Sequence, residues 1–170
     1  MLISLGAATS CCKLSGTDMA THHKRVKAGD ILELKAGDRF AYLQYIGRHL
    51  EYGDVVLVSP RLQERQASVT GKNFADGYIA FYPVAAAITQ GLVEVIAHLP
   101  PPNLPKRLRR AGARSGRRVD TWIIEDGNRE VVKGELSEEE LRLPIAAIWN
   151  HEMLVQRIAE GWNPEQEGRE

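Results

Sequence analysis

Histidine and carboxylate side chains are the residues of this chain best suited to hold a metal ion. His49 lies in a predicted turn, and Glu51 follows it two positions later. His98 lies at the end of a predicted strand, before a run of prolines. Imidazole and carboxylate groups are common zinc ligands, so these three would form a site if the fold brought them together. Scattered surface histidines are much commoner than metal sites. The sequence therefore predicts no metal and no cofactor.

Sequence motifs for catalysis are nearly absent. His151 and Glu152 begin the helical zinc-protease pattern, but Val155 stands where the second histidine is required. The run 138–140 contains three glutamates that could serve as paired carboxylates. It follows Ser137 in a capping-box pattern, however, and negative charge in a first helical turn complements the helix dipole. The sequence thus predicts a binding protein rather than an enzyme.

The basic segment 106–118 is the best candidate for nucleic-acid binding. Residues 101–120 contain seven basic side chains and one acidic side chain, Asp120. Arginines neutralise phosphates, although the segment has no aromatic residues for base stacking. We expect an exposed, mobile loop, because like charges are not buried unpaired. RNA or DNA binding is the alternative function, through four arginines of this segment: Arg109, Arg110, Arg117 and Arg118.

Composition and charge favour one globular domain without a global attraction for nucleic acid. The 170 residues are 44% hydrophobic and 26% charged, and 22 basic side chains balance 22 acidic ones. Residues 121–170 are acidic, with twelve acidic and five basic side chains. This uneven distribution of charge, basic at 101–120 and acidic at 121–170, indicates either a partner-binding surface or a solvated loop and a solvated helix. The only cysteines, Cys11 and Cys12, fit a reducing compartment, so we expect a cytoplasmic protein without a membrane helix.

The two ends of the chain lack a periodic apolar pattern. Residues 1–25 include a mildly apolar stretch, but no basic residue precedes it as in a signal peptide. We expect a disordered leader, or a natural start at Met19. A single α+β domain is expected over 26–162, followed by a disordered tail at 163–170.

Short apolar runs separated by Gly-Asp pairs predict an antiparallel sheet. Such pairs stand at 29–30, 37–38 and 53–54, where glycine permits the positive φ of a tight turn. Asp126 and Gly127 separate two further runs and give the best hairpin signal in the chain. The fold class expected is therefore α+β, with a barrel-like antiparallel sheet of about six strands.

Two helices are expected against this sheet, a short one at 83–90 and a C-terminal one near 151–160. The first follows the pattern of proline at the start and glycine at the end. The second is capped by Asn150, and its apolar residues recur at helical spacing. We expect it to dock through Trp149, Leu154, Ile158 and Trp162. Its other face should meet water or a partner through Glu152, Arg157 and Glu160.

Residues 26–58 resemble the immunity protein 26 family of bacterial polymorphic toxin systems. The resemblance rests on Gly29-Asp30 with the strand that follows, and on Gly37-Asp38 before a strand that contains Ala41-Tyr42. The family implies a small intracellular protein that binds and blocks a cognate toxin domain without chemistry of its own. No binding residue of the family maps onto this chain. The partner-binding residues proposed from the sequence are Tyr52, Glu152, Arg157 and Glu160.

Overall fold

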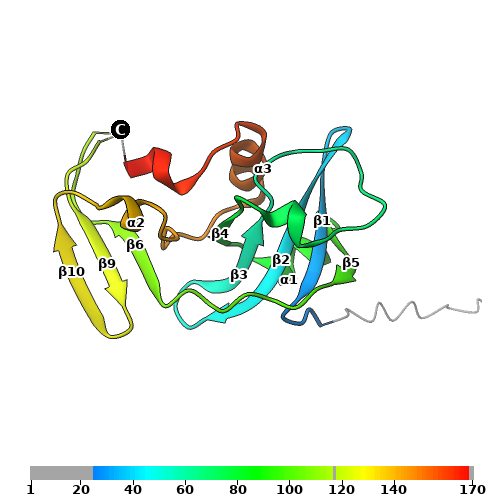
Figure 1. Ribbon diagram of the computed structural model, residues 1–170, viewed down its shortest axis with the longest axis horizontal. Coiled ribbons are helices and arrows are strands. Elements are labelled where there is room, and N and C mark those ends of the chain that lie inside the picture. Colours follow the sequence, from blue (N-terminus) through cyan, green and yellow to red (C-terminus); the bar gives the residue numbers. More distant parts are fainter. Residues whose placement is uncertain (1–24, 117, 169–170) are drawn as a thin grey trace, which may run out of the picture.

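The computed structural model describes residues 25–116 and 118–168 (Figure 1). The expected leader therefore lies outside the described residues, apart from Arg25. Five antiparallel strands form the larger sheet, in the order β4-β3-β2-β1-β5. Their bounds are β1 Asp30–Ala36, β2 Arg39–His49, β3 Gly53–Val58, β4 Tyr78–Phe81 and β5 Val93–His98.

A smaller antiparallel sheet lies beside the first, in the order β10-β9-β6. Its strands are β6 Arg107–Ala111, β9 Trp122–Asp126 and β10 Arg129–Lys133. The hairpin predicted at Asp126 and Gly127 is confirmed, because β9 and β10 pair across that turn. Between β6 and β9, the short strands β7 Arg114–Ser115 and β8 Arg118–Val119 pair with each other.

Short helices complete the fold: α1 Val84–Thr89, α2 Glu138–Leu141 and α3 His151–Ala159, with 3₁₀ turns η1 Gly71–Phe74 and η2 Pro164–Gly168. The described chain is thus strand-rich, with 39% strand and 19% helix. The expected mixed fold, its antiparallel strands and the two predicted helices are confirmed. The sheets are open, however, so the strands do not close into a barrel. No helix within the described ranges is long and apolar enough to cross a membrane.

The main core lies between the five-stranded sheet and α3. Leu154 and Ile158 are one helical turn apart and fully buried, and Trp149 packs beside them. Asn150 caps the helix by accepting a hydrogen bond from the Met153 N–H at 2.7 Å. Trp162 folds back on Trp149, with 5.0 Å between their ring centroids. The predicted docking of the last helix is therefore confirmed.

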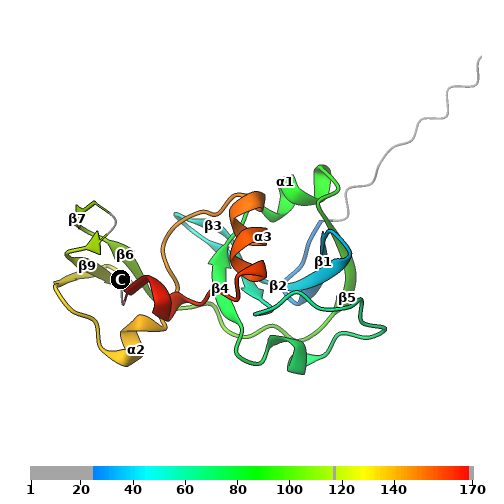
Figure 2. The same ribbon diagram turned by 90° about the horizontal axis from the view of Figure 1, so that it is seen from above.

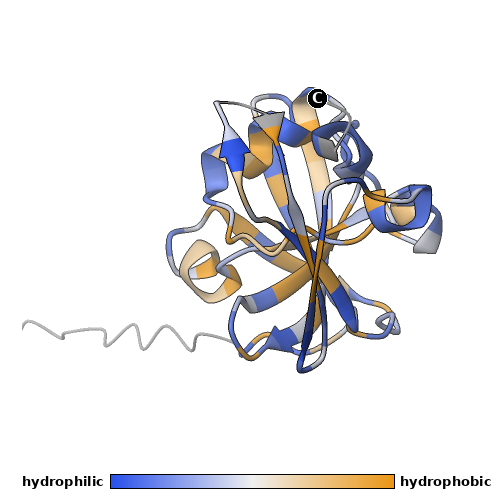
Figure 3. Ribbon diagram, turned by 90° about the vertical axis from the view of Figure 1, so that its left-hand side faces the viewer, coloured by the Kyte–Doolittle hydropathy of each residue, from blue (hydrophilic) through white to orange (hydrophobic). Residues whose placement is uncertain are grey.

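The chain passes between the two sheets more than once, which fixes them side by side (Figures 1 and 2). Arg109 of β6 and Ile145 form a parallel bridge, and Phe81 of β4 forms another with Ile148. The segment before α3 thus lies against both sheets. Figure 3 shows apolar residues along the strands at the centre of the molecule and hydrophilic residues mainly in the outer loops.

Two segments that were predicted to be mobile or disordered have regular structure. The basic segment 106–118 is not a mobile loop, because its first half forms β6 and Arg109 is completely buried. The tail is ordered as η2 up to Gly168, with Pro164 buried. Arg117 and residues 169–170 lie outside the described residues. The two corrections have different causes: β6 forms because it pairs with β9, whereas contacts of Glu165 and Glu167 with Arg142, Arg157 and Arg114 hold the tail.

Candidate partner-binding surface

The metal site considered from the sequence is not formed. His98 binds Asp30 instead, with 3.0 Å between Nδ1 and Oδ1. His49 Nδ1 accepts a hydrogen bond from the Glu51 backbone N–H at 3.3 Å. Over the described part of the chain, no group of three or more histidine, cysteine, aspartate or glutamate residues is placed to hold a metal ion.

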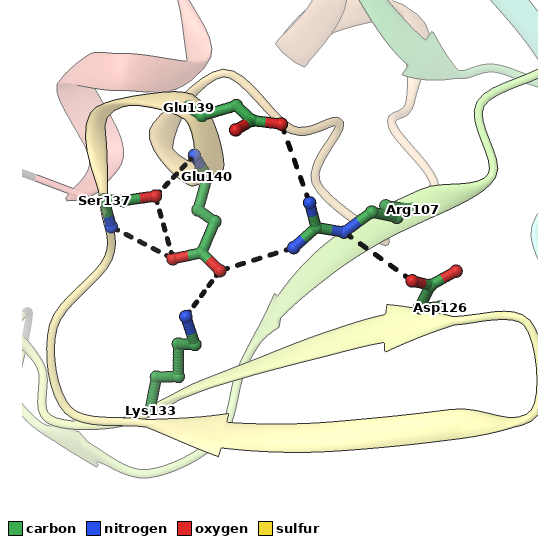
Figure 4. Close-up of polar contacts among 6 residues, drawn as sticks. All are labelled: Arg107, Asp126, Lys133, Ser137, Glu139 and Glu140. Atoms are coloured by element: carbon green, nitrogen blue, oxygen red, sulfur yellow. Dashed lines mark hydrogen bonds and ion pairs between the residues drawn. The ribbon is translucent and has the colours of Figure 1, made fainter.

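Glu140 lies at the centre of a polar cluster that joins α2 to the three-stranded sheet (Figure 4). Its Oε1 accepts from Lys133 Nζ at 2.6 Å and from Arg107 Nη2 at 3.3 Å. Its Oε2 accepts from the Ser137 N–H at 3.0 Å and from the Ser137 hydroxyl at 3.1 Å, which completes the predicted capping box. Arg107 also meets Glu139 at 3.7 Å and Asp126 at 3.9 Å.

These contacts keep the Glu140 carboxylate ionised. The hydrogen bond from Lys133 and those from Ser137 lower the pKa of Glu140 to about 2. A carboxylate with this pKa holds no proton to donate near neutral pH and is a weak base. Both of its oxygen atoms are also occupied. Glu140 therefore has a structural role, as the capping interpretation predicts, and its carboxylate is poorly suited to acid–base catalysis.

The arginines of the basic segment are paired within the chain. Arg110 donates to Glu125 at 2.7 Å and to Glu130 at 2.9 Å. Arg114 lies 3.5 Å from a carboxylate oxygen of Glu167. The split between basic and acidic segments thus reflects pairing inside the molecule. A phosphate would have to displace these carboxylates before it could bind Arg110, while only the backbone of Arg118 is described, in β8.

Arg109 has a different environment, because it is fully buried under η2. Its Nη2 donates to the backbone carbonyl of Pro164, and its guanidinium carbon lies 4.7 Å from the centroid of the Trp122 ring. Burial lowers its pKa to about 10, so the group stays charged at neutral pH. Its Nε and Nη1 have no hydrogen-bond partner among the described residues. A nucleic acid cannot reach Arg109 in this arrangement.

Tyr52 forms the most distinctive surface feature, where the β2–β3 turn meets the three-stranded sheet. Its hydroxyl donates to Glu125 of β9 at 2.9 Å, and Arg110 donates to the same carboxylate. The Tyr52 ring lies 5.2 Å from the ring of His49 and 5.1 Å from that of Phe81. Burial and the Glu125 hydrogen bond raise the pKa of Tyr52 to about 12, so it remains a donor. The structure thus brings together Tyr52, a candidate for protein binding, and Arg110, a candidate for nucleic-acid binding.

Among the described residues, Leu50 is the most exposed large apolar residue, at 97% of its accessible surface. It stands at the tip of the β2–β3 turn, beside a cavity of about 230 Å³ that Gly127 and Asn128 of the β9–β10 turn also line. We call residues 49–52 and 125–130 together the hairpin-tip surface. It combines a tyrosine held by ring packing and a hydrogen bond with an exposed leucine and a charged rim.

The sequence-based candidates on α3 lie elsewhere. Tyr52 packs with Phe81 on one face of the five-stranded sheet, whereas α3 covers the other face. Glu152 and Glu160 are exposed, as expected. Arg157 is only partly exposed, because its guanidinium packs against the rings of both Trp149 and Trp162, at 4.2 and 4.3 Å from their centroids. The four proposed partner-binding residues therefore do not form one surface.

Sequence reasoning missed Leu50, Glu125 and His49 as members of one surface. An available signal was Leu50 itself, an apolar residue between His49 and Glu51 in a predicted turn. The pairing of Tyr52 with Glu125 spans 73 positions, so local patterns do not reveal it.

A larger groove of about 810 Å³ lies between the sheets. Leu57 and Ile79 line one side, and Pro105, Pro144 and Pro164 are among its other lining residues. The groove therefore offers apolar walls, and its arginines are engaged by carboxylates. Its lining residues include no serine, threonine, cysteine or histidine.

Comparison of the chain with models of protein families, with curated proteins and with solved structures finds no match. The interpretation of its function therefore depends on the geometry above.

Proposed function

We propose that the protein is a non-enzymatic binding protein that captures a protein partner at the hairpin-tip surface. The observation that carries this proposal is the exposure of Leu50, at 97%, beside the fixed ring of Tyr52. An apolar side chain held out from a tight turn loses contact with water when a partner covers it. Tyrosine adds a large contact area with little loss of conformational freedom.

The polar groups around this surface suit recognition. Glu125 accepts from both Tyr52 and Arg110, so the carboxylate and its partners hold one another in place. Lys106 is exposed and lines the same cavity, and Glu51 lies at the turn. A partner would therefore meet an apolar tip surrounded by charges of both signs, which favours specificity over general adhesion.

The finer proposal is that the partner is a toxin domain, neutralised by an immunity-type protein in the cytoplasm. The support for it is the resemblance of residues 26–58 to the immunity protein 26 family, a stretch that includes the turn at 49–52. RNA or DNA binding through residues 106–118 is less well supported. Arg110 and Arg114 already have carboxylate partners, and Arg109 is buried.

The test uses the polypeptide encoded by the gene next to the one for this chain. Titration calorimetry should detect a complex, and Leu50→Asp should weaken it at least about 30-fold, the scale of an interface hot spot. Met153→Gln is the matched control, because Met153 is also an exposed apolar residue, at 40%, but lies on α3. An unchanged affinity of the Leu50→Asp variant would refute the hairpin-tip surface. A neighbouring gene product that is no toxin and does not bind would refute the finer proposal.

A further inference from the structure

The C-terminal segment 164–168 contacts four arginines through three of its residues. Glu165 accepts from Arg142 Nε at 2.9 Å. Glu167 accepts from Arg157 Nη2 at 3.2 Å and lies 3.5 Å from Arg114 Nη2. Figure 1 shows this segment, in red, running from α3 toward the three-stranded sheet. It therefore binds the rest of the molecule much as a short acidic peptide would.

The strongest sign of a binding site is Arg109, which lies under this segment. The residue is completely buried, yet only Nη2 of its guanidinium has a partner, the carbonyl of Pro164. Nε and Nη1 have no hydrogen-bond partner among the described residues. Arg157 Nη1 is buried without a partner in the same sense. Buried donors are nearly always satisfied in proteins, so the unsatisfied nitrogen atoms of these two arginines, both of which contact the tail, require an explanation.

We propose that Arg109, Arg114, Arg142 and Arg157 form a binding site for acidic peptide segments, and that residues 164–168 occupy it in the free protein. We call these four arginines the tail site. The site is separate from the hairpin-tip surface, and its existence does not depend on that surface. A segment of a partner with a better-matched set of acceptors takes the place of the tail.

The contacts favour a peptide as the ligand. One backbone carbonyl, that of Pro164, meets the deepest arginine, and two carboxylates two residues apart meet the other three. Trp122 stacks on Arg109, and Trp149 and Trp162 enclose Arg157. These rings fix the guanidinium groups in position, so the spacing of their acceptors is also fixed. A free phosphate ion could take the place of the Glu167 carboxylate between Arg114 and Arg157, but it would not supply the Pro164 carbonyl at Arg109 and the Glu165 carboxylate at Arg142 as well.

The unsatisfied donors also explain how the tail can be displaced. Each buried donor without an acceptor weakens the hold of the tail, because its bond to water has been lost without replacement. The tail stays bound since its attachment to α3 gives it a high effective concentration. A competing segment must overcome that advantage, so weakening the tail should expose the site to external peptides.

The test compares the full chain with a Glu165→Gln, Glu167→Gln variant. The probe is a fluorescent peptide with the sequence of residues 163–170, and the control peptide has glutamine for each glutamate. Fluorescence anisotropy should show the acidic peptide binding the variant about tenfold or more tighter than it binds the parent chain. The control peptide should bind neither protein.

A further substitution tests whether the peptide binds at the tail site. Adding Arg114→Gln to the variant should abolish peptide binding, because it removes one arginine of the tail site. The substitution should spare the core, since the Arg114 side chain is 46% exposed. Adding Arg129→Gln instead should leave binding unchanged, since Arg129 is an exposed arginine of β10 outside the tail site. Failure of the acidic peptide to bind the variant would overturn the proposal. Equal binding of the control peptide, or stronger competition by inorganic phosphate or a single-stranded oligonucleotide, would overturn the assignment to acidic peptides.

Discussion

Replacing Glu140 with glutamine should remove a charge-dependent part of the stability of the fold. Glutamine has the same shape and can still accept from Ser137, but it cannot pair electrostatically with Lys133 and Arg107. The difference between the ordinary pKa of 4.5 and the value of about 2 in the folded protein corresponds to an upper limit of about 3 kcal/mol. Lys133 and Arg107 are 37% and 35% exposed, so solvent screens the interaction. We therefore expect a loss of about 1–2 kcal/mol at pH 7.

The contribution of Glu140 to stability should depend on pH. The pKa of Glu140 is lower in the folded than in the unfolded state, so its contribution is complete above pH 4.5 and disappears as the pH falls toward 2. Urea unfolding at pH 7, 4.5 and 2.5 should show the difference between parent and Glu140→Gln shrinking as the pH falls. Glu139→Gln is the matched control, because that side chain is 85% exposed. An equal stability of parent and Glu140→Gln at pH 7 would refute the reasoning.

Other perturbations probe the core and its buried polar groups. Ile158→Ala should cost about 2–5 kcal/mol in urea unfolding, because Ile158 is 1% exposed, whereas Met153→Ala should change little. Arg109→Met should be neutral or stabilising in the same assay, since it removes a buried charge with two unsatisfied nitrogens; a large loss would show that the charge supports the fold. Burial lowers the pKa of His151 beside the Tyr82 hydroxyl, so stability should fall as the pH drops below 6.5. His151→Gln should flatten that slope, and an unchanged slope would contradict the assignment.

Local sequence patterns were sufficient to predict those elements whose structure is determined by residues close together in the sequence. The Asn150 cap and the spacing of Leu154 and Ile158 predicted α3, and Asp126-Gly127 predicted the β9–β10 turn. Each of these signals depends on residues that lie close together in the sequence. Whether a sheet closes into a barrel depends on whether its two edge strands, which are distant in the sequence, pair with each other. The pattern of strands along the sequence therefore did not reveal that the sheets are open.

Patterns of charge were misleading because their partners are distant. The segment 106–118 looks like an exposed loop until carboxylates from positions 125, 140 and 167 are placed against it. The tail at 163–168 has no apolar periodicity, yet carboxylate–arginine contacts order it. The hairpin-tip surface requires Tyr52 and Glu125 to meet across two sheets. Only tertiary structure supplies these pairings.

Hydrogen–deuterium exchange on the complex with the neighbouring gene product is the most direct test of the proposed binding mode. Binding should slow the exchange of backbone amides at 49–52 and 125–130, because a partner on the hairpin-tip surface would cover both turns. Amides in α3, on the other face of the five-stranded sheet, should exchange as they do in the free protein. Protection confined to α3, with unchanged exchange at both turns, would contradict the proposed surface.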